Sequence, residues 1–290
     1  MFEELEKLKK IDIKSADVEE ISDLIDVVRN RIHNYGKAEL DTFFDIAIKI
    51  IGAKRGIAAK KAAETLSAAY GKLKNRILSM LWSDDPHLRT VGMKIITENK
   101  DKEAISILCK DKDRDIRKFG LDIAYELTYI EPLKQGLDDP DINVMVSAAE
   151  YLSRLGETSA VDKIREKLES LSKDQIYEAI FLIQSLINLE YPKTAEIVRK
   201  KFDPNDPIIK PYYILACGIS RNINYIQDIL EALKDSSDVR KNAIDSLIIL
   251  LRDLNIPQDK KDQIKRTIEK LIPTFNTQEL EMTKKVLSML

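Results

Sequence analysis

The chain has 290 residues, of which 44% are hydrophobic and 33% are charged, so it can bury a substantial core and is not composed like a disordered chain. Lysine and arginine together number 47, against 49 for aspartate and glutamate, a balance that argues against a nucleic-acid binder whose whole surface is basic. The charged beginning MFEELEKLKK has no apolar segment like that of a secretory signal, and apolar stretches such as AIFLIQSLINL are too short to cross a bilayer. We therefore expect a cytoplasmic protein that does not insert into membranes.

The two ends of the chain carry helical patterns that differ from the pattern between them. VEEISDLIDVVRNRI and LDTFFDIAIKII, near the start, have apolar residues at helical spacing. The terminal units of a stacked-repeat protein are usually atypical, because one of their faces meets water. We therefore assign residues 1–48 to irregular N-terminal capping helices. Residues 273–290, which include TQELEMTKKVLSML, are assigned to a C-terminal capping helix.

Residues 49–76 form a strongly basic segment. They contain eight lysines and arginines and a single acid, Glu64, whereas residues 1–48 contain twelve acids and seven bases. Such a run is either a solvated helical face or a docking patch for an acidic protein segment or a nucleic-acid backbone. Only Tyr70 is aromatic within it, so stacking on bases is not expected. The candidate docking residues are Lys54, Arg55, Lys60, Lys61, Lys72, Lys74 and Arg76.

One phrase recurs along the chain. Asp, Ser or Pro is followed by an aliphatic residue, usually by Arg, and then by a helical pattern, as in SDDPHLRTVGMKII, DKDRDIRKFGLDIA, DPDINVMVSAAEYL and KDSSDVRKNAIDSL. SKDQIYEAIFLIQS and NDPIIKPYYILACG are weaker copies, and AAKKAAETLSAAYGKL, with Ala59 in the key position, is a degenerate one. A period near 30 residues indicates stacked supersecondary units. The key aliphatic residues, at spacings of 28, 28, 32, 33 and 30, are Leu88, Ile116, Val144, Ile176, Ile209 and Val239.

Each copy predicts one buried helical face, because positions 4, 7 and 8 after the key residue fall on one side of a helix. A small residue recurs within this face, as close helix packing requires. In the four stronger copies the positions are filled by Gly92, Ile95 and Ile96; Gly120, Ile123 and Ala124; Ala148, Tyr151 and Leu152; and Ala243, Ser246 and Leu247.

The charged start of each copy has a physical function. Asp and Ser side chains accept hydrogen bonds from the amides of the first helical turn and lie at the positive end of the helix dipole. Pro86 and Pro140 are tolerated near a helix start, where no intrahelical donor is lost. The phrase therefore ends one helix and begins the next.

Every period also predicts a second, shorter helix. KEAISILCK, TSAVDKIREKLE, KTAEIVRKKF, NYIQDILEALK and KKDQIKRTIEKL each follow a first helix after a short polar break. Gly156 is suited to a helix C-terminus, and Thr158 or Ser159 to the next N-cap. No stretch alternates apolar and polar residues for long enough to indicate a strand, so the chain is predicted to be all-α.

The chain resembles the HEAT-repeat family, whose pattern is D-x-D-x-x-[VIL]-R, an Ala-rich first helix, Leu-Gly-x and a second helix ending in Leu. The resemblance is carried by DKDRDIRKFGLDIAYEL and DPDINVMVSAAEYLSRLGETSAVDKIREKL, and the short repeats are similar to the bacterial and archaeal variety. The family's Arg is kept as Arg89, Arg117 and Arg240. Elsewhere it is replaced by Met145, Tyr177 and Lys210.

The resemblance implies a right-handed α-α superhelix of stacked helical hairpins. We expect one solenoid over residues 1–290, with a degenerate repeat at 49–82 and six HEAT-like repeats at 83–272. First helices are expected to form the outer, convex layer, and second helices to line a concave groove. Candidate protein-binding residues on the second helices are Lys102, Ser106, Lys134, Lys163, Lys167, Lys200 and Gln227.

The sequence offers no convincing catalytic, cofactor or metal site. His33 and His87 belong to no HExxH motif, Cys109 and Cys217 form no CxxC pair, and no P-loop or GxGxxG is present. Some HEAT-like proteins excise alkylated bases with several tryptophans on a basic concave surface, whereas this chain has only Trp82. Bilin lyases also contain such repeats, but no residue points specifically to them.

The favoured interpretation is a non-catalytic scaffold or adaptor that binds another protein, possibly an acidic one, through the groove or the basic segment. One alternative is a nucleic-acid-binding module that uses residues 49–76. A DNA alkylbase glycosylase is the less favoured alternative. Salt dependence separates the first two, since phosphate contacts weaken steeply as salt rises.

Overall fold

The computed structural model describes residues 2–53 and 56–290. These residues form α-helices and short 3₁₀ helices and contain no strand, so the predicted all-α solenoid class is confirmed. None of the helices in this part of the chain has both the length and the apolar character needed to cross a bilayer.

The chain forms two compact units, Met1–Pro132 and Leu133–Leu290, and α9 (Ile130–Gly136) contains the boundary. Within the first unit the α-helices are α1 (Glu3–Lys10), α2 (Val18–Arg31), α3 (Lys37–Gly52), α4 (Ile57–Ala68), α5 (Tyr70–Ser79), α6 (Pro86–Asn99), α7 (Lys102–Leu108) and α8 (Arg114–Glu126). Its 3₁₀ helices are η1 (Ile32–Asn34) and η2 (Met80–Trp82). The prediction of one continuous solenoid remains a prediction.

The second unit continues the alternation of longer and shorter helices. Its α-helices are α10 (Ile142–Arg154), α11 (Val161–Ser170), α12 (Ile176–Asn188), α13 (Thr194–Lys201), α14 (Lys210–Ile219), α15 (Ile226–Ala232), α16 (Ser237–Asp253), α17 (Gln258–Leu271) and α18 (Thr277–Leu287). Its 3₁₀ helices are η3 (Thr158–Ala160), η4 (Ile223–Tyr225) and η5 (Ile272–Thr274).

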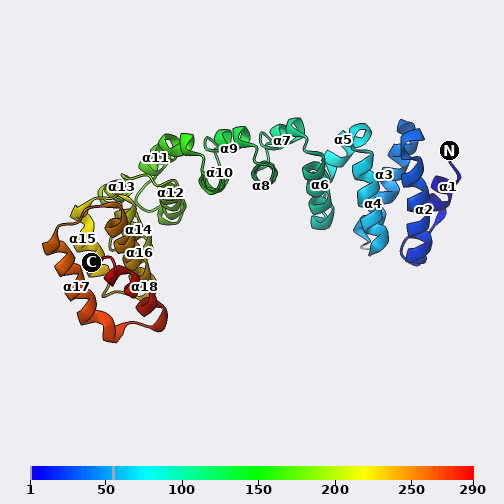
Figure 1. The fold of residues 1–290 in the computed structure, drawn as a ribbon. Coiled ribbons are helices and arrows are strands. Elements are labelled where there is room, and N and C mark those ends of the chain that lie inside the picture. Colours follow the sequence, from blue (N-terminus) through cyan, green and yellow to red (C-terminus); the bar gives the residue numbers. More distant parts are fainter. Residues whose placement is uncertain (1, 54–55) are drawn as a thin grey trace. The chain divides into compact units, whose positions relative to one another are not determined.

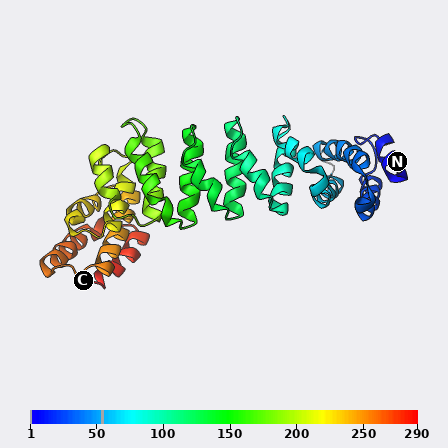
Figure 2. The ribbon, with the colours of Figure 1, turned by 90° about the horizontal axis from the view of Figure 1, so that it is seen from above.

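Each unit is built from two layers of helices. In the first unit α2, α4 and α6 lie side by side, and α3 packs against α4, α5 and α6. In the second unit α10, α12, α14, α16 and α18 form one layer, while α11, α13 and α15 each pack on the helix that follows (Figure 1). In Figure 2 the green and yellow-green hairpins from α10 to α13 follow one another along the stack.

The layers of the second unit lie opposite to our expectation from sequence. The unit is curved, with α11, α13, α15 and α17 along its outer side and α12, α14, α16 and α18 along its inner side (Figure 1). A Cβ added to Gly218 of α14 would lie 2.7 Å from the Cα of Ser246 on α16. This contact joins α14 to α16 within the layer of first helices, and in this unit the second helices do not line the concave side.

The predicted buried faces are confirmed. Ile95, Ile123, Leu152 and Leu247 are all at most 2% exposed, and the small residues of the same faces are buried. Tyr151 is half-buried. Four of the six key aliphatic residues are buried, and Leu88 and Ile176 are half-buried.

The register predicted around Ile176 is wrong by two residues. First helices end at residues with positive φ, namely Lys100, Thr128, Gly156, Glu190 and Arg221. Four of these residues lie 12 positions after the key aliphatic residue of their copy, but Glu190 lies 14 positions after Ile176. Counting 12 positions back from Glu190 puts the position of the key residue of α12 at Glu178 instead of Ile176. The buried apolar face of α12 begins with Ala179, which is fully buried.

Aspartates cap α6, α8 and α10, as the recurring phrase predicts. Carboxylates of Asp85, Asp113 and Asp141 accept hydrogen bonds from the backbone amide two residues later, at 2.8, 2.8 and 2.9 Å. Ser236, at the start of α16, accepts no such bond. The capped amides would otherwise lack partners at the helix start.

The recurring arginine binds the loop in front of its own helix. Arg89 donates to the carbonyl of Ser83 at 2.7 Å, and Arg117 donates to that of Asp111 at 3.0 Å. Arg240 donates to the carbonyl of Leu233 at 3.0 Å. Since guanidinium groups here satisfy carbonyls at the end of the preceding helix, these arginines serve the connection between hairpins.

Replacing Ile123 by aspartate should lower the free energy of unfolding by about 3–5 kcal/mol, because an unpaired carboxylate would enter a helical face that is 1% exposed. Ile107→Asp is the matched control, since Ile107 is 48% exposed on α7. It should change stability by about 0.5 kcal/mol or less. Urea denaturation measures both values, and equal losses in the two variants would contradict the packing described.

Glu279 should make stability depend on acidity. Burial alone would raise the pKa of its carboxyl, but hydrogen bonds from the Asn276 amide, Ser237 and Arg240 outweigh burial and lower it. A lowered folded pKa stabilises above the ordinary value of 4.5, and this contribution is lost as pH falls through the folded pKa. Glu279→Gln should cost about 1–3 kcal/mol at neutral pH. The difference in the free energy of unfolding between the variant and the parent should shrink below pH 4.5 in denaturation curves. A difference that stays constant with pH would contradict the lowered pKa of Glu279.

Candidate protein-binding groove

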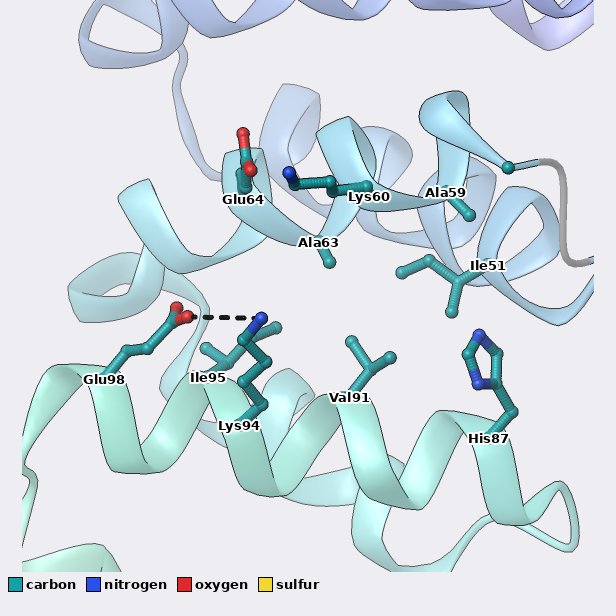
Figure 3. Close-up of a pocket in the computed structure, with 11 residues that line it drawn as sticks. Ile51, Ala59, Lys60, Ala63, Glu64, His87, Val91, Lys94, Ile95 and Glu98 are labelled. Atoms are coloured by element: carbon teal, nitrogen blue, oxygen red, sulfur yellow. Dashed lines mark ion pairs between the residues drawn. The ribbon is translucent and has the colours of Figure 1, made fainter.

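An apolar groove lies between α4 and α6 in the first unit, closed at one side by the end of α3 (Figure 3). Its volume is about 420 Å³, within the range of roughly 300–1,000 Å³ that is usual for ligand pockets. It is lined by Ile51, Gly56, Ala59, Lys60, Ala63, Glu64, His87, Val91, Lys94, Ile95 and Glu98.

The floor of the groove is open because α4 carries small residues. Ala59 and Ala63 lie one helical turn apart, and they face Val91 and Ile95 of α6 across the opening (Figure 3). Ile51, at the end of α3, is fully buried behind them. Methyl side chains fill little of the space between the two helices, so Ala63 and Val91 remain partly exposed. Ala59 stands where the stronger copies of the repeat carry Leu, Ile or Val.

The rim is charged and most of its charges are paired. Glu64 forms an ion pair with Arg29, with 2.9 Å between the guanidinium nitrogen and the carboxylate oxygen. The ammonium nitrogen of Lys94 lies 3.9 Å from a carboxylate oxygen of Glu98 on the same helix. Glu98 also accepts a hydrogen bond from Ser67 at 3.1 Å. Lys60 is exposed and forms no ion pair with any residue that the structure describes.

Most of the basic segment is engaged within the fold. Lys61 pairs with Asp26 at 2.6 Å, and Lys74 pairs with Asp101 and Glu103, each at 2.8 Å. These acids come from outside residues 49–76. The basic segment and the acidic residues before and after it therefore pair with each other between successive parts of the stack.

The remaining candidates of this segment differ in their surroundings. Arg76 pairs with Asp45 and lies 4.4 Å from the ring centre of Phe44. Lys72 donates to the carbonyl of Tyr35 at 3.2 Å. Lys54 and Arg55 lie outside the described residues. Of the described candidates, Lys60 alone lines the groove.

Hydrogen bonds to Asp101 and Glu103 raise the pKa of Lys74. Burial raises the pKa of Tyr70, whose hydroxyl donates to Asp101 at 3.1 Å. The carboxyl of Asp101 has a lowered pKa, because bonds from Lys74, Ala104 and Tyr70 outweigh the effect of burial. This part of the basic segment thus forms a stable ionic junction between α5 and the start of α7.

The candidates on the second helices are divided between the two units. In the first unit, Lys102 lies 5.1 Å from the ring centre of Tyr129, and Ser106 donates to the backbone of its own helix. In the second unit, Lys163 and Lys167 both pair with Asp138.

Other second-helix candidates also have partners within the second unit. Lys134 pairs with Glu157 at 3.4 Å and Lys200 with Glu196 at 2.6 Å, while Gln227 bonds to Glu231 at 2.8 Å. Lys200 lines a polar cavity of about 760 Å³ between α11 and α13. Their roles in binding remain predictions.

The groove was not identified from sequence, although one signal for it was present. In the predicted register Ala59 occupies a key aliphatic position without the usual bulk, whereas Ala63, one turn later, falls where the four stronger copies also have Gly or Ala. Chemically the groove can receive an apolar group beside a cation. Among the described residues, no three His, Cys, Asp or Glu side chains are placed to hold a metal ion.

No family model matches the chain, and a comparison with curated proteins also finds no match. Among solved structures, the chain is similar to an engineered protein with a TM-score of 0.50 and 12% identity, over 99% of each chain. It is also similar to the complex of CpcE and CpcF of phycocyanin lyase from Nostoc sp. PCC7120. That match has a TM-score of 0.43 and 13% identity, and covers 74% of this chain and 93% of the other. At such identities the likeness concerns the fold alone.

Charge reversal should affect Lys74 and Lys60 differently, although the sequence places both in one basic segment. Lys74→Glu removes two ion pairs and places a third carboxylate beside Asp101 and Glu103, so we expect a loss of about 1–3 kcal/mol. Lys60→Glu should change stability by about 0.5 kcal/mol or less. Thermal and urea denaturation test this contrast, and an unchanged Lys74→Glu protein would contradict the ionic junction.

Proposed function

We propose that this protein is a non-catalytic HEAT-like scaffold that binds another protein, and that the groove between α4 and α6 is a contact site. The observation that carries this proposal is the apolar floor inside a charged rim, in which Ala63 and Val91 are partly exposed beside the buried Ala59 and Ile95. Burying such surface against apolar side chains of a partner is favourable. Well-packed pockets of this kind are where binding energy concentrates in protein interfaces.

The features of the basic segment favour a protein partner over nucleic acid. Affinity for a nucleic-acid backbone increases with the number of phosphates that free cations neutralise. Lys61 and Lys74 are paired with carboxylates of the same chain, and Arg76 is paired with Asp45. An apolar groove in which, among the described lining residues, Lys60 alone is an unpaired lysine provides little of the charge that a phosphate backbone requires.

Filling the groove should abolish binding at this site without unfolding the chain. Ala63→Trp places an indole over the apolar floor, whereas Ala68→Trp, at the exposed end of the same helix, is the matched control. Proteins retained by the parent chain from an extract of its source cells are identified by mass spectrometry. Their affinities for both variants are then measured with purified components.

We expect Ala63→Trp to weaken the binding of a true partner at least about tenfold, equivalent to about 1.4 kcal/mol. Ala68→Trp should leave its affinity within about twofold, a change of less than about 0.5 kcal/mol. Denaturation curves of both variants verify that they fold. A partner that binds the parent and the filled variant equally would show that the groove is not the contact site.

A further inference from the structure

Lys60 is the lining residue whose charge has no ion-pair partner among residues 2–53 and 56–290. Its neighbours on the rim are paired, Glu64 with Arg29 and Glu98 with Lys94. Its sequence neighbour Lys61 is held by Asp26 at 2.6 Å. Lys60 is therefore the lining residue with the greatest capacity to attract a charge from outside the chain.

The position of Lys60 couples this charge to the apolar floor. It lies between Ala59 and Ala63 on α4, and all three residues line the same opening (Figure 3). A group that enters the groove to cover the alanines therefore passes beside the ammonium. Apolar contact also removes water from the neighbourhood of the charge, which strengthens its pairing with an anion.

The other titratable groups at the groove do not cancel this preference. His87 lies on α6 near the end where α4 begins, close to Ile51 (Figure 3). The carboxylate of Glu64 lies one turn further along α4 and is already paired with Arg29. Lys94 and Glu98 compensate each other at 3.9 Å. The free charge at the groove is thus positive and local.

We infer that the occupant of this groove is a protein segment in which a carboxylate lies beside the apolar side chains that enter it. This inference rests on the proposed function and specifies the chemistry of the partner. The apolar side chains cover Ala59, Ala63 and Val91, and the carboxylate pairs with Lys60. A nucleic acid could supply an anion but no aliphatic group for the floor, and it requires several free cations rather than one.

The occupant is short where it touches the groove. A volume of about 420 Å³ is near the lower end of the range of roughly 300–1,000 Å³ for pockets that enclose a small ligand. One or two aliphatic side chains fill such a space, so the carboxylate must follow closely in sequence or lie one helical turn away. The recognised element is therefore a short acidic-apolar motif, presented by an extended segment or by one face of a helix.

A displayed library of random short peptides provides the test, because it requires no known partner. The library is selected on the parent chain, Ala63→Trp, Lys60→Glu and Lys110→Glu. Lys110 is a matched control, since it is an exposed lysine of the same unit that does not line the groove. Enriched peptides are synthesised, and their affinities for all four proteins are measured by fluorescence anisotropy.

The parent should select peptides that combine aliphatic residues with Asp or Glu, and Ala63→Trp should lose them. Lys60→Glu should weaken these peptides about three- to fivefold, the upper part of the range that an exposed charge pair contributes. The same variant should instead enrich peptides with Lys or Arg in place of the acid. Lys110→Glu should select the same peptides as the parent.

Failure of the inference can be distinguished from failure of the proposed function. If Ala63-dependent peptides appear but show no preference for acids, or keep their affinity for Lys60→Glu, the inference is overturned while the groove remains a protein-binding site. If no selected peptide depends on Ala63, the groove binds no protein segment and both are overturned. Labelled DNA or RNA that binds in a Lys60-dependent manner, where the peptides fail, would likewise overturn both.

Discussion

Close contact between neighbouring helices of one layer is the interaction on which the rest of this structure depends. On α14, a Cβ at Gly218 would lie 2.7 Å from the Cα of Ser246 on α16. The hydroxyl of Ser246 donates to the backbone carbonyl of Ile214 at 2.8 Å, so the polar atom in this contact also joins the two helices. Small residues also let the two layers approach, since a Cβ at Gly120 of α8 would lie 2.7 Å from the Sγ of Cys109 at the end of α7. Apolar residues beside such contacts become the core.

Small residues also form the groove between α4 and α6, but here they leave a space between the helices. Ala59 and Ala63 are small, but Val91 and Ile95 opposite them do not close the space, and an opening of about 420 Å³ remains. The small side chains of α4 thus leave the partly exposed Ala63 and Val91 as an accessible apolar surface. The charged rim around it is what limits which partners can use that surface.

Ionic contacts reinforce the stack at the spacing of the repeat. Lys61 pairs with Asp26 across 35 positions of sequence. Arg221 pairs with Glu190 and with Asp253, across 31 and 32 positions. Charges about one repeat apart meet because adjacent hairpins place equivalent positions side by side. Lys60, beside Lys61 in sequence, has no such partner among the described residues, and this difference gives the groove its charge.

The sequence by itself determined the all-α class, the period of the hairpins, the aspartate caps and the buried faces that contain Ile95, Ile123 and Leu247, because these features follow from local spacing and first-turn hydrogen bonding. Tertiary structure alone decided the register of α12, the side of the second unit on which the second helices lie, the pairing of Lys74 and the groove beside Ala63. Each of these features depends on the distance between helices that are remote in sequence. Side-chain volumes and loop lengths set that distance together, so no local sequence pattern encodes it.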